Sequence, residues 1–420
     1  MYRYIIGLDV GSSKICASVG KVNDEGKISV IGTTMASCSG LKKGAVVDID
    51  MTAEAIEKCI FSLEKIVEFK INEVYISIQG GICDFYNNKG VVAVENEDRE
   101  ISRSDVNRAL EASKLISIEG NKEIIGAIPE QFIVDGYDNI NDPIGMSGVQ
   151  LEVEAKVILS QSTVVNNLIK SVNKAGIKVL GITLESMALS SSILLEDEKE
   201  KGVAVIDIGF DTINISVFKN KKLCKTIFIP LGGNNVTKDL SLCLNISYEE
   251  AEKLKHKYGA LSKNDKEENI SLNTSKQENN QVSSYKIVDI ITARVDETLR
   301  FVRTFLKESG YYDEIHNIVL AGGGFTFLKD IINFSEEIFK KPIRIGMPQY
   351  IGAINPLYST AVGIIMDVVK SSKLERVSSV SKNVELEDRV DCSIDENEDE
   401  EDNEKLGIMG KIKDFFADFF

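Results

Sequence analysis

The chain has 420 residues, 43% hydrophobic and 27% charged, which is typical of a globular protein large enough for two or more cores. Its net charge of -16 argues against nucleic acid as the main partner. Seven scattered cysteines without a CxxC pair indicate reduced thiols in the cytosol, and the two distant histidines argue against a His-rich metal site or a catalytic triad.

The first apolar run contains Asp9, so it is not the core of a signal peptide. The longest uncharged run, residues 345–366, holds two prolines and does not predict a transmembrane helix. Apolar residues at helical spacing in residues 52–69 predict a helix, and "EVYISIQG" after it predicts a strand. Strands and helices that alternate in this way indicate an α/β fold.

Residues 5–19, "IIGLDVGSSKICASV", form a strand, a tight turn and a second strand, and residues 203–217, "VAVIDIGFDTINISV", repeat the pattern 198 residues later. The alignment pairs Asp9 with Asp207. It also pairs Gly11 with Gly209. Such a turn directs backbone N–H groups into one concavity where an anion binds. The aspartate can hold water on a phosphate-bound Mg²⁺. Two facing turns would bind a polyphosphate from both sides, whereas a single one is more often an ordinary β-turn.

Residues 84–160 predict a small α+β module, and a helix follows at 162–177. The strand–turn–strand pattern restarts at Gly202, followed by a helical region at 236–258 and a helix at about 287–309. Between these helices, the polar stretch 261–286 predicts a surface loop. Two more glycine turns, "PLGGNNVT" (230–237) and "VLAGGGF" (319–325), complete a set of four phosphate- or nucleoside-facing elements.

The last 50 residues carry half of the net negative charge. Residues 371–405, with the run "DENEDEEDNE", predict a disordered acidic linker. The final segment 406–420 predicts an amphipathic helix, either docked on the protein's own body or lying in a membrane surface. The long linker favours the membrane. The apolar face comprises Ile408, Met409, Ile412, Phe415, Phe416, Phe419 and Phe420.

These motifs resemble the actin/Hsp70/sugar-kinase superfamily and, within it, the FtsA family of bacterial actin-like cell division proteins. The resemblance covers almost the full length, through "GLDVGSSKI", "PIGMSGVQLEVEAKVIL", "VIDIG", "AEKLKHKYG", "VLAGGGF", "NPLYSTAVGII" and the amphipathic C-terminus. It implies an α/β, actin-like two-lobed fold with duplicated RNase H-like halves and an added small α+β subdomain of SHS2 type.

The resemblance also implies a division of the chain. The first lobe would comprise residues 1–83, completed by 161–201 and 346–370, and the second would comprise 202–235, completed by 312–345. Residues 84–160 would be the inserted subdomain for filament and division partners. Residues 236–311 would be the outer subdomain, which receives the C-terminal peptide of FtsZ. The linker 371–405 and the membrane-targeting helix 406–420 would follow.

By the same resemblance, ATP with Mg²⁺ would lie between the lobes. Asp9 and Asp207 would organise the Mg²⁺ through water, and Glu185 would either position an attacking water or simply begin a helix. Glu252 and Lys255 would lie near the ribose and base, or else form a solvent-exposed helix pair. The remaining contacts to the nucleotide would come from Gly11, Ser12, Ser13, Lys14, Gly209, Thr212, Gly232, Gly233, Gly322, Gly323 and Gly324.

The sequence departs from the family pattern in three places. Phe210 and Asp211 stand where many members have small glycines in the second phosphate loop, so we expect a charge near the triphosphate that weakens binding and makes ATP hydrolysis slow or absent. Thr292 and Ala293 replace an acidic residue and a proline before Arg294. Asn214 stands where an aspartate is common.

The sequence therefore predicts an ATP-binding, polymerising actin homologue. It would tether FtsZ filaments (the Z ring) to the cytoplasmic face of the cell membrane at the division site and recruit later division proteins. Two alternatives belong to the same superfamily. One is a pilus-assembly, Hsp70-like or other actin-like ATPase, and the other is a small-molecule kinase, which would need a substrate cleft with a dedicated base.

Overall fold

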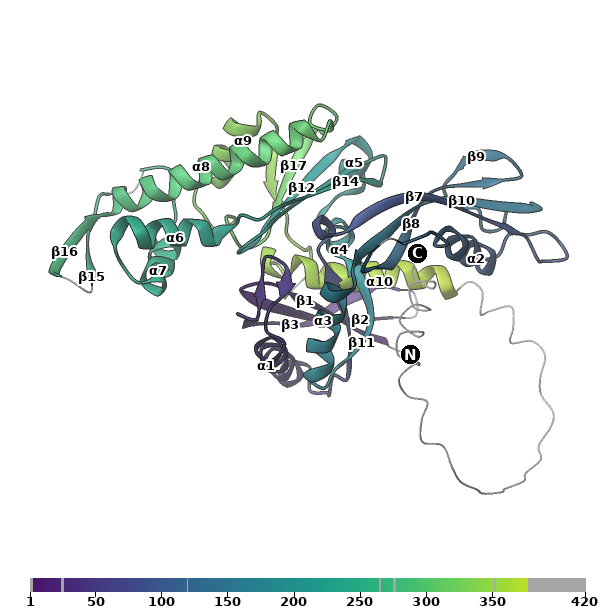
Figure 1. Ribbon diagram of the computed structural model, residues 1–420, viewed down its shortest axis with the longest axis horizontal. Helices are drawn as coiled ribbons and strands as arrows, with labels where there is room; N and C mark the ends of the chain where they lie inside the picture. Colours follow the sequence, from purple (N-terminus) through teal and green to yellow (C-terminus); the bar gives the residue numbers. More distant parts are fainter. Residues whose placement is uncertain are drawn as a thin grey trace, which may run out of the picture. The chain divides into compact units, whose positions relative to one another are not determined.

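The computed structural model of the protein describes residues 3–23, 26–118, 120–263, 266–274, 277–350 and 352–376. The chain forms two compact units. The larger unit contains residues 3–82 and most of 166–366, and the smaller is built around residues 83–165. Figure 1 labels the elements of both units.

The larger unit contains two five-stranded sheets with the same strand order. In each, three antiparallel strands follow one another, and two later strands extend the sheet beyond the first (β3-β2-β1-β6-β11 and β14-β13-β12-β17-β18). The first sheet comprises β1 (Arg3–Val10), β2 (Lys14–Val22), β3 (Ile28–Ser37), β6 (Glu73–Ile78) and β11 (Lys178–Leu184). The second comprises β12 (Val203–Ile208), β13 (Ile213–Lys219), β14 (Lys222–Ile229), β17 (Asn317–Ala321) and β18 (Ile343–Ile345).

The two sheets also share their strand register. Asp9 pairs with Cys16 across the first turn, and Asp207 pairs with Asn214 across the second. The strand next to the first one runs parallel in both sheets: β6 beside β1 and β17 beside β12. The repeat predicted from the sequence is therefore a duplicated half of the fold, shifted by the same 198 residues.

The first sheet is covered by helices that approach its backbone closely. Helix α1 (Ile49–Val67) begins at Asp48, whose side chain accepts a hydrogen bond from the N–H of Met51. On β1, a β-carbon at Gly7 would lie 2.2 Å from the carbonyl oxygen of Ala361 in α10 (Ser359–Arg376). The other elements of this half are β4 (Leu41–Lys42), β5 (Ala45–Val46), α3 (Ser162–Lys174) and α4 (Glu185–Ile193). The short helix α5 (Glu196–Lys201) packs against β13 of the second sheet.

The second half carries a helical outer part, visible at the left of Figure 1. It comprises α6 (Gly233–Leu244), α7 (Tyr248–Tyr258), α8 (Ser284–Glu308) and, on the sheet, α9 (Ile331–Phe339). The helical region predicted at 236–258 is thus two helices. They are separated at Asn245, which adopts the left-handed conformation with φ 53°.

The prediction of a loop over residues 261–286 was wrong. This stretch contains a hairpin of β15 (Asn269–Thr274) and β16 (Gln277–Ser283), in which Ile270 pairs with Val282. Leu272 and Val282 are buried in the hydrophobic core of the second half. The reason is the alternation of a few apolar residues with polar ones, a strand signal that the strongly polar composition concealed.

The smaller unit is a four-stranded antiparallel sheet in the order β7-β10-β8-β9, with one helix packed on it. Ser102 caps the helix α2, where its side chain and that of Asp105 form a reciprocal capping box. The buried residues of α2 and the sheet form a core of their own. The elements are β7 (Asp84–Ala93), α2 (Arg103–Ser113), β8 (Lys122–Val134), β9 (Tyr137–Ile140) and β10 (Gln150–Gln161).

Helix α10 continues to Arg376, so the first six residues of the predicted linker 371–405 are helical. The rest of that linker and the predicted amphipathic helix 406–420 lie outside the described residues. Within the described ranges, no helix is both long enough and apolar enough to cross a membrane.

The close approach of α10 to β1 gives a first prediction. Replacing Gly7 with valine would force the β-carbon against the backbone of Ala361, and overpacking of this kind costs about 1–3 kcal/mol. We expect a lower urea midpoint for Gly7→Val by circular dichroism. Glu57→Val, on the exposed face of α1, introduces the same side chain and should unfold like the wild type. An unchanged midpoint for Gly7→Val would contradict the packing.

Candidate functional site

The two strand turns that the sequence predicted to face a phosphate have the same backbone geometry. The N–H of Gly11 donates to the carbonyl of Lys14 at 3.0 Å, and the N–H of Gly209 donates to the carbonyl of Thr212 at 2.8 Å. Ser12 and Ser13 lie within the first turn. The hydroxyl of Thr212 accepts a hydrogen bond from the amide of Gln79 at 3.3 Å, so the two halves meet at the second turn.

Two carboxylates stand where the first strand of each half ends. Asp9 accepts a hydrogen bond from the hydroxyl of Ser77 at 2.9 Å. The pKa of Asp9 is raised to about 6, mainly by burial and also by the nearby charge of Asp207, although the hydrogen bond from Ser77 and the charge of Lys14 act in the opposite direction. Burial also raises the pKa of Asp207.

Glu185, at the start of α4, joins these carboxylates and is only 6% exposed. It shares a hydrogen bond with Asp207. It also accepts one from the side-chain amide of Asn214 at 3.1 Å. Burial first, and then the charges of Asp207 and Asp9, raise the pKa of Glu185 well above its ordinary value. The three acids therefore form one electrostatically strained cluster, because like charges in a buried site oppose each other's ionisation.

This cluster does not directly form a metal site. Within the described ranges, no group of three or more His, Cys, Asp or Glu side chains could hold a metal ion. These carboxylates can still hold water molecules of a hydrated Mg²⁺, which keeps several of its waters in phosphate sites. The donor set thus fits a hydrated cation that is bound mainly by phosphate.

The glycine turns of the second half meet in the same place. The N–H of Gly324 donates to the carbonyl of Ile208 at 2.7 Å, and the N–H of Gly233 donates to that of Gly209 at 3.0 Å. Gly322 has a φ of 79°, and a β-carbon there would lie 2.3 Å from Oδ1 of Asp207. Only glycine suits this position, because other residues rarely adopt a positive φ and none would avoid the carboxylate.

Lys14 extends from the first half toward the glycine turns of the second half. Its Nζ lies 2.8 Å from where a β-carbon on Gly323 would be. The ammonium is also close enough to lower the pKa of Lys255, although burial is the larger cause. The structure therefore brings the first turn, the second turn and the glycines of residues 232–233 and 322–324 together, with the ammonium of Lys14 close to Gly323.

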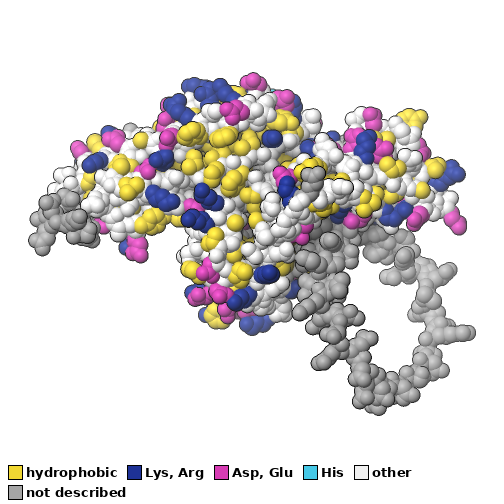
Figure 2. Space-filling model, in the orientation of Figure 1, with side chains coloured by type: hydrophobic (Ala, Val, Ile, Leu, Met, Phe, Trp, Pro, Cys, Tyr) yellow, Lys and Arg dark blue, Asp and Glu magenta, His cyan; other side chains and the backbone are white. Residues whose placement is uncertain are grey.

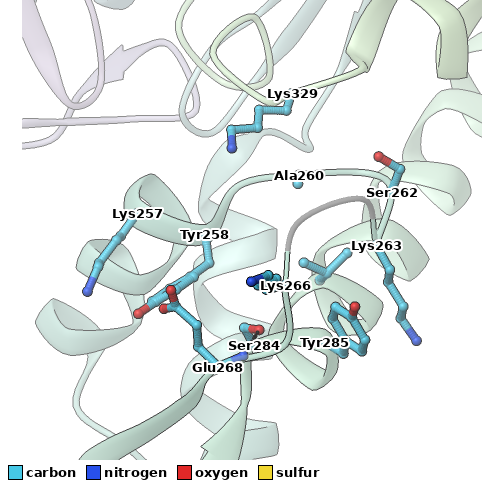
Figure 3. A pocket seen from close by; sticks show the side chains of 11 residues that line it. Lys257, Tyr258, Ala260, Ser262, Lys263, Lys266, Glu268, Ser284, Tyr285 and Lys329 are labelled. Carbon is cyan, nitrogen blue, oxygen red and sulfur yellow. Dashed lines mark hydrogen bonds between the residues drawn. The ribbon is translucent and has the colours of Figure 1, made fainter.

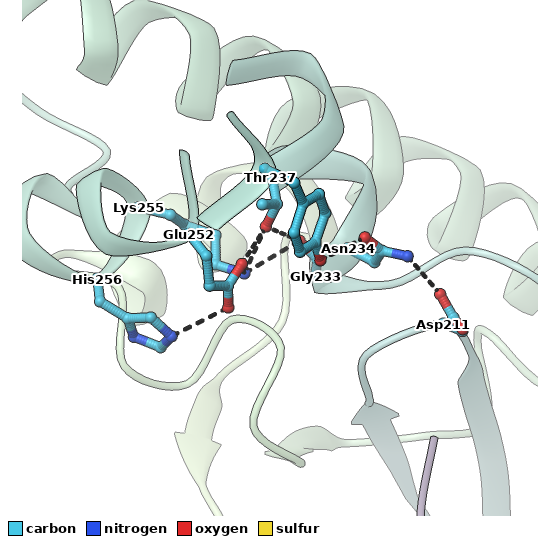
Figure 4. Close-up of polar contacts among 8 residues, drawn as sticks. Asp211, Gly233, Asn234, Thr237, Glu252, Lys255 and His256 are labelled. Carbon is cyan, nitrogen blue, oxygen red and sulfur yellow. Dashed lines mark hydrogen bonds and ion pairs between the residues drawn. The ribbon is translucent and has the colours of Figure 1, made fainter. Parts of the chain in front are cut away.

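Phe210 and Asp211, the unusual residues of the second turn, are held by the start of α6. The N–H of Asn234 donates to the carbonyl of Phe210 at 2.9 Å, and its side-chain amide donates to the carboxylate of Asp211 at 2.7 Å. The hydroxyl of Tyr248 in turn donates to Asn234 at 2.7 Å. Figure 4 shows Asp211 directed toward Asn234. The negative charge is thus engaged at a helix N-terminus, which stabilises it.

Glu252 and Lys255 form a compact network rather than a solvent-exposed pair. Lys255 is 3% exposed, and its ammonium donates to Glu252 at 2.7 Å and to Thr237 at 2.8 Å. Thr237 also donates to Glu252, whose second oxygen lies 3.2 Å from the ring of His256 (Figure 4). Burial opposes ionisation of Glu252, but the hydrogen bonds from Lys255 and Thr237 hold its pKa below the ordinary value.

The alternative of an exposed helix pair was therefore wrong for Lys255. Its ammonium also lies 3.3 Å from the carbonyl of Gly233, so the network ties α7 to the glycine turn at the start of α6. Gly232 in that turn donates its N–H to the side chain of Asn235 at 3.0 Å.

The sequence reasoning missed Ser77, Gln79, Asn234 and Tyr248. A signal existed for the first two. They lie at the end of β6, in "YISIQG", and β6 runs parallel to β1. The carboxyl ends of neighbouring parallel strands meet at one edge of a sheet, so polar residues at the end of β6 could have been placed beside Asp9 from the sequence. No local pattern marked Asn234 or Tyr248.

Comparison with known proteins gives the family. The family profile "Cell division protein FtsA" matches residues 204–363, and the profile "SHS2 domain inserted in FTSA" matches residues 80–159. The cell division protein FtsA of Bacillus subtilis is 36% identical over 373 residues, which are 88% of this chain and 84% of that protein. The chain belongs to the FtsA family.

Other FtsA proteins agree over similar lengths. That of Neisseria meningitidis serogroup B is 37% identical, covering 86% of this chain and 89% of the relative. That of Enterococcus faecalis is 31% identical and covers 99% of this chain and 98% of the relative. Membership of the FtsA family makes this chain an actin-like cell division protein and disfavours the kinase alternative.

Solved structures share the fold at low identity. The "PilM-PilN type IV pilus biogenesis complex" matches with a TM-score of 0.60 and 14% identity, over 86% of this chain and 97% of that one. MreB5 of Spiroplasma citri bound to ADP matches with a TM-score of 0.53 and 15% identity, over 91% and 99%. The actin-like α/β fold with an SHS2 domain, predicted from the sequence for this FtsA-family protein, is confirmed.

The buried acid cluster gives a prediction for stability. The folded-state pKa of Asp9, about 6, lies above the ordinary aspartate value of 3.8. The folded protein thus keeps a proton that the unfolded chain releases between these values, and stability falls as pH rises through this window. Asp9→Asn replaces the carboxyl group with a neutral amide and so removes the cost of burying a negative charge at this position. Near about pH 7.5 we expect this variant to have a higher urea midpoint than the wild type. Its free energy of unfolding should be greater by roughly 1–3 kcal/mol, after allowance for the partial exposure of residue 9.

At about pH 3 the two proteins should unfold alike, since the wild-type carboxyl is then largely protonated in both states. The measurement is urea unfolding in EDTA, followed by tyrosine fluorescence. A variant that is equally destabilised at both pH values would show that Asp9 is not penalised by burial.

Proposed function

We propose that this FtsA-family protein binds ATP with Mg²⁺ between its duplicated halves and uses the nucleotide as a conformational and polymerisation ligand. The observation that supports this most is the convergence of two equivalent turns, closed by matching N–H to carbonyl bonds, on the ammonium of Lys14 and two glycine segments. Turns of this kind bind anions through backbone N–H groups, and Lys14 would add a point charge to the phosphates.

Each predicted site residue would then have a role. Gly11, Ser12, Ser13 and Lys14 would contact the phosphates from the first half, and Gly209 and Thr212 from the second. Asp9 and Asp207 would hold waters of the Mg²⁺, whose charge offsets that of the phosphates. The ribose and base would lie against the elements that hold Gly232, Gly233, Glu252, Lys255, Gly322, Gly323 and Gly324.

We infer slow or absent hydrolysis. Glu185 is buried, and both Asn214 and Asp207 are bonded to it. A carboxyl that is engaged in this way is a poor base for water. Asp211 keeps its negative charge, and its bond to Asn234 holds the carboxylate at the start of α6, so we still expect it to weaken ATP binding.

We further propose that the protein tethers FtsZ filaments to the cytoplasmic face of the cell membrane at the division site, assembles into filaments and recruits later division proteins. Membership of a cell division family supports this role. The membrane contact would be made by segment 406–420, whose apolar residues between Ile408 and Phe420 would form one face of a helix. The FtsZ C-terminal peptide would bind the part formed by residues 236–311, and residues 84–160 would contact neighbours and partners.

Lys14 offers the direct test of nucleotide binding. A hydrogen bond from a charged group to a phosphate contributes about 1.5–3 kcal/mol, so Lys14→Ala should weaken binding of a fluorescent ATP analogue by about tenfold or more. Lys27→Ala, at an exposed lysine outside the turn, should bind like the wild type. Equal affinities for both variants, or no binding by the wild type with millimolar Mg²⁺, would refute the proposed site.

A vesicle assay tests the tether. Full-length protein should carry FtsZ into the pellet with liposomes, and protein lacking residues 406–420 should leave both proteins in the supernatant, because the apolar anchor is removed. The control is sedimentation of both proteins without vesicles, because it shows how much FtsZ pellets through contact between filaments alone. If FtsZ pelleted with vesicles equally well in the presence of the truncated and the full-length protein, the proposed role of the terminal segment would be contradicted.

A further inference from the structure

A pocket of about 390 Å³ opens in the outer part of the second half. Its walls are the end of α7, the segment that leads to β15, the start of α8 and the loop before α9, seen from close by in Figure 3. The pocket shares no lining residue with the two strand turns or the glycine segments that surround Lys14. It is within the size range of small-molecule sites, about 300–1,000 Å³.

Lysines dominate the lining. Lys257 comes from α7, Lys263 and Lys266 come from the segment before β15, and Lys329 comes from the loop before α9. Glu268 is the one acidic residue among the lining residues. Figure 2 shows acidic and basic side chains interspersed on one face of the molecule. The described lining of this pocket differs, because it carries four lysines and one glutamate in a chain whose net charge is -16.

Existing contacts neutralise only part of this charge. Lys263 lies 2.7 Å from Asp289 on α8 and is paired with it. Lys257 has its ammonium 4.9 Å from the ring of Tyr258, and this contact leaves the positive charge in place. Lys266 is exposed and, like Tyr258, lines the pocket (Figure 3). The pocket therefore keeps a positive potential that a bound anion would lower.

The helix that begins at the pocket adds to this potential. Ser284 and Tyr285 line the cavity and form the first turn of α8, which spans 25 residues and has no acidic residue in that turn. Its N-terminal partial positive charge is thus not neutralised within the helix. The hydroxyls of Tyr258, Tyr285 and Ser284 are donors suited to phosphate oxygens, and Val288 with the tyrosine rings gives an apolar wall.

We propose that this lysine pocket binds a phosphate-bearing small molecule, at a site separate from the proposed nucleotide site. Lysine binds phosphate as a point charge, and several lysines from different elements can surround more than one phosphate group. The cavity accepts a ligand of nucleotide size, and the tyrosine rings offer faces for a planar or apolar part of it.

The ligand would act on the elements around the proposed nucleotide site. The N–H of Lys329 donates to the carbonyl of Gly259 at 3.0 Å, and the N–H of Leu261 donates to that of Lys329 at 3.2 Å. Lys329 follows the glycine segment 322–324, and Gly259 follows α7, which carries Lys255. An anion bound by Lys329 and Lys257 would therefore hold these two elements together.

Pyrophosphate is the probe for the test, with full-length protein that carries Lys14→Ala so that the proposed nucleotide site contributes little. Calorimetry should show binding that weakens with added salt. The further change Lys266→Glu with Lys329→Glu should weaken it by about tenfold or more. The matched control, Lys253→Glu with Lys238→Glu, reverses two exposed lysines outside the pocket and should leave the affinity within about twofold.

A second measurement does not depend on the folding of the charge variants. Pyrophosphate should protect Lys266 and Lys329 of the Lys14→Ala protein from chemical acetylation, read by mass spectrometry, and leave Lys253 and Lys238 unprotected. Equal loss of affinity in both charge variants, absence of pyrophosphate binding, or protection by an acidic peptide alone would overturn the proposal. A wild type that binds pyrophosphate here but no ATP analogue would refute the nucleotide site and leave this inference intact.

Discussion

Close contact between backbone segments is the constraint on which the candidate site depends. The second strand turn is fixed on two sides by main-chain hydrogen bonds, from Gly324 to Ile208 and from Gly233 to Gly209. For these bonds to form, the segments must lie so close together that a β-carbon at Gly322 would collide with its neighbours. The glycines are therefore explained first by contact between loops, and their suitability for a ligand follows from the concavity that this contact creates.

The same region carries an energetic cost. Asp9, Asp207 and Glu185 are buried together, and the pKa of each is raised, so each is destabilised when ionised. Proteins tolerate such clusters at functional sites and compensate elsewhere. Here the compensation comes from hydrogen bonds: Ser77 donates to Asp9 and Asn214 donates to Glu185. A Mg²⁺ ion with its waters would relieve the repulsion further, which links cation binding to the stability of the site.

The departures from the family pattern find local explanations. Asp211 is bonded to Asn234, which is bonded to Tyr248, so the second turn is connected to α7 by side chains. Asn214 replaces a common aspartate and donates to Glu185, where a second acid would add a further like charge. Arg294 follows Thr292 and Ala293 within the unbroken helix α8, and it is bonded to Asp239 at 2.5 Å.

The sequence by itself determined the duplication, the family and the residues of both turns, because glycines and aspartates at fixed spacing reflect backbone geometry that local sequence controls. It also located several of the helices and strands around them. It took α6 and α7 as one helical region, placed the end of α10 in a linker, and missed the hairpin β15–β16, whose few apolar residues were hidden in a polar stretch. The tertiary structure alone decided which residues meet. Ser77 reaches Asp9, Asn234 engages Asp211, and four lysines surround one pocket, because these contacts join segments far apart in the sequence and no local pattern encodes them.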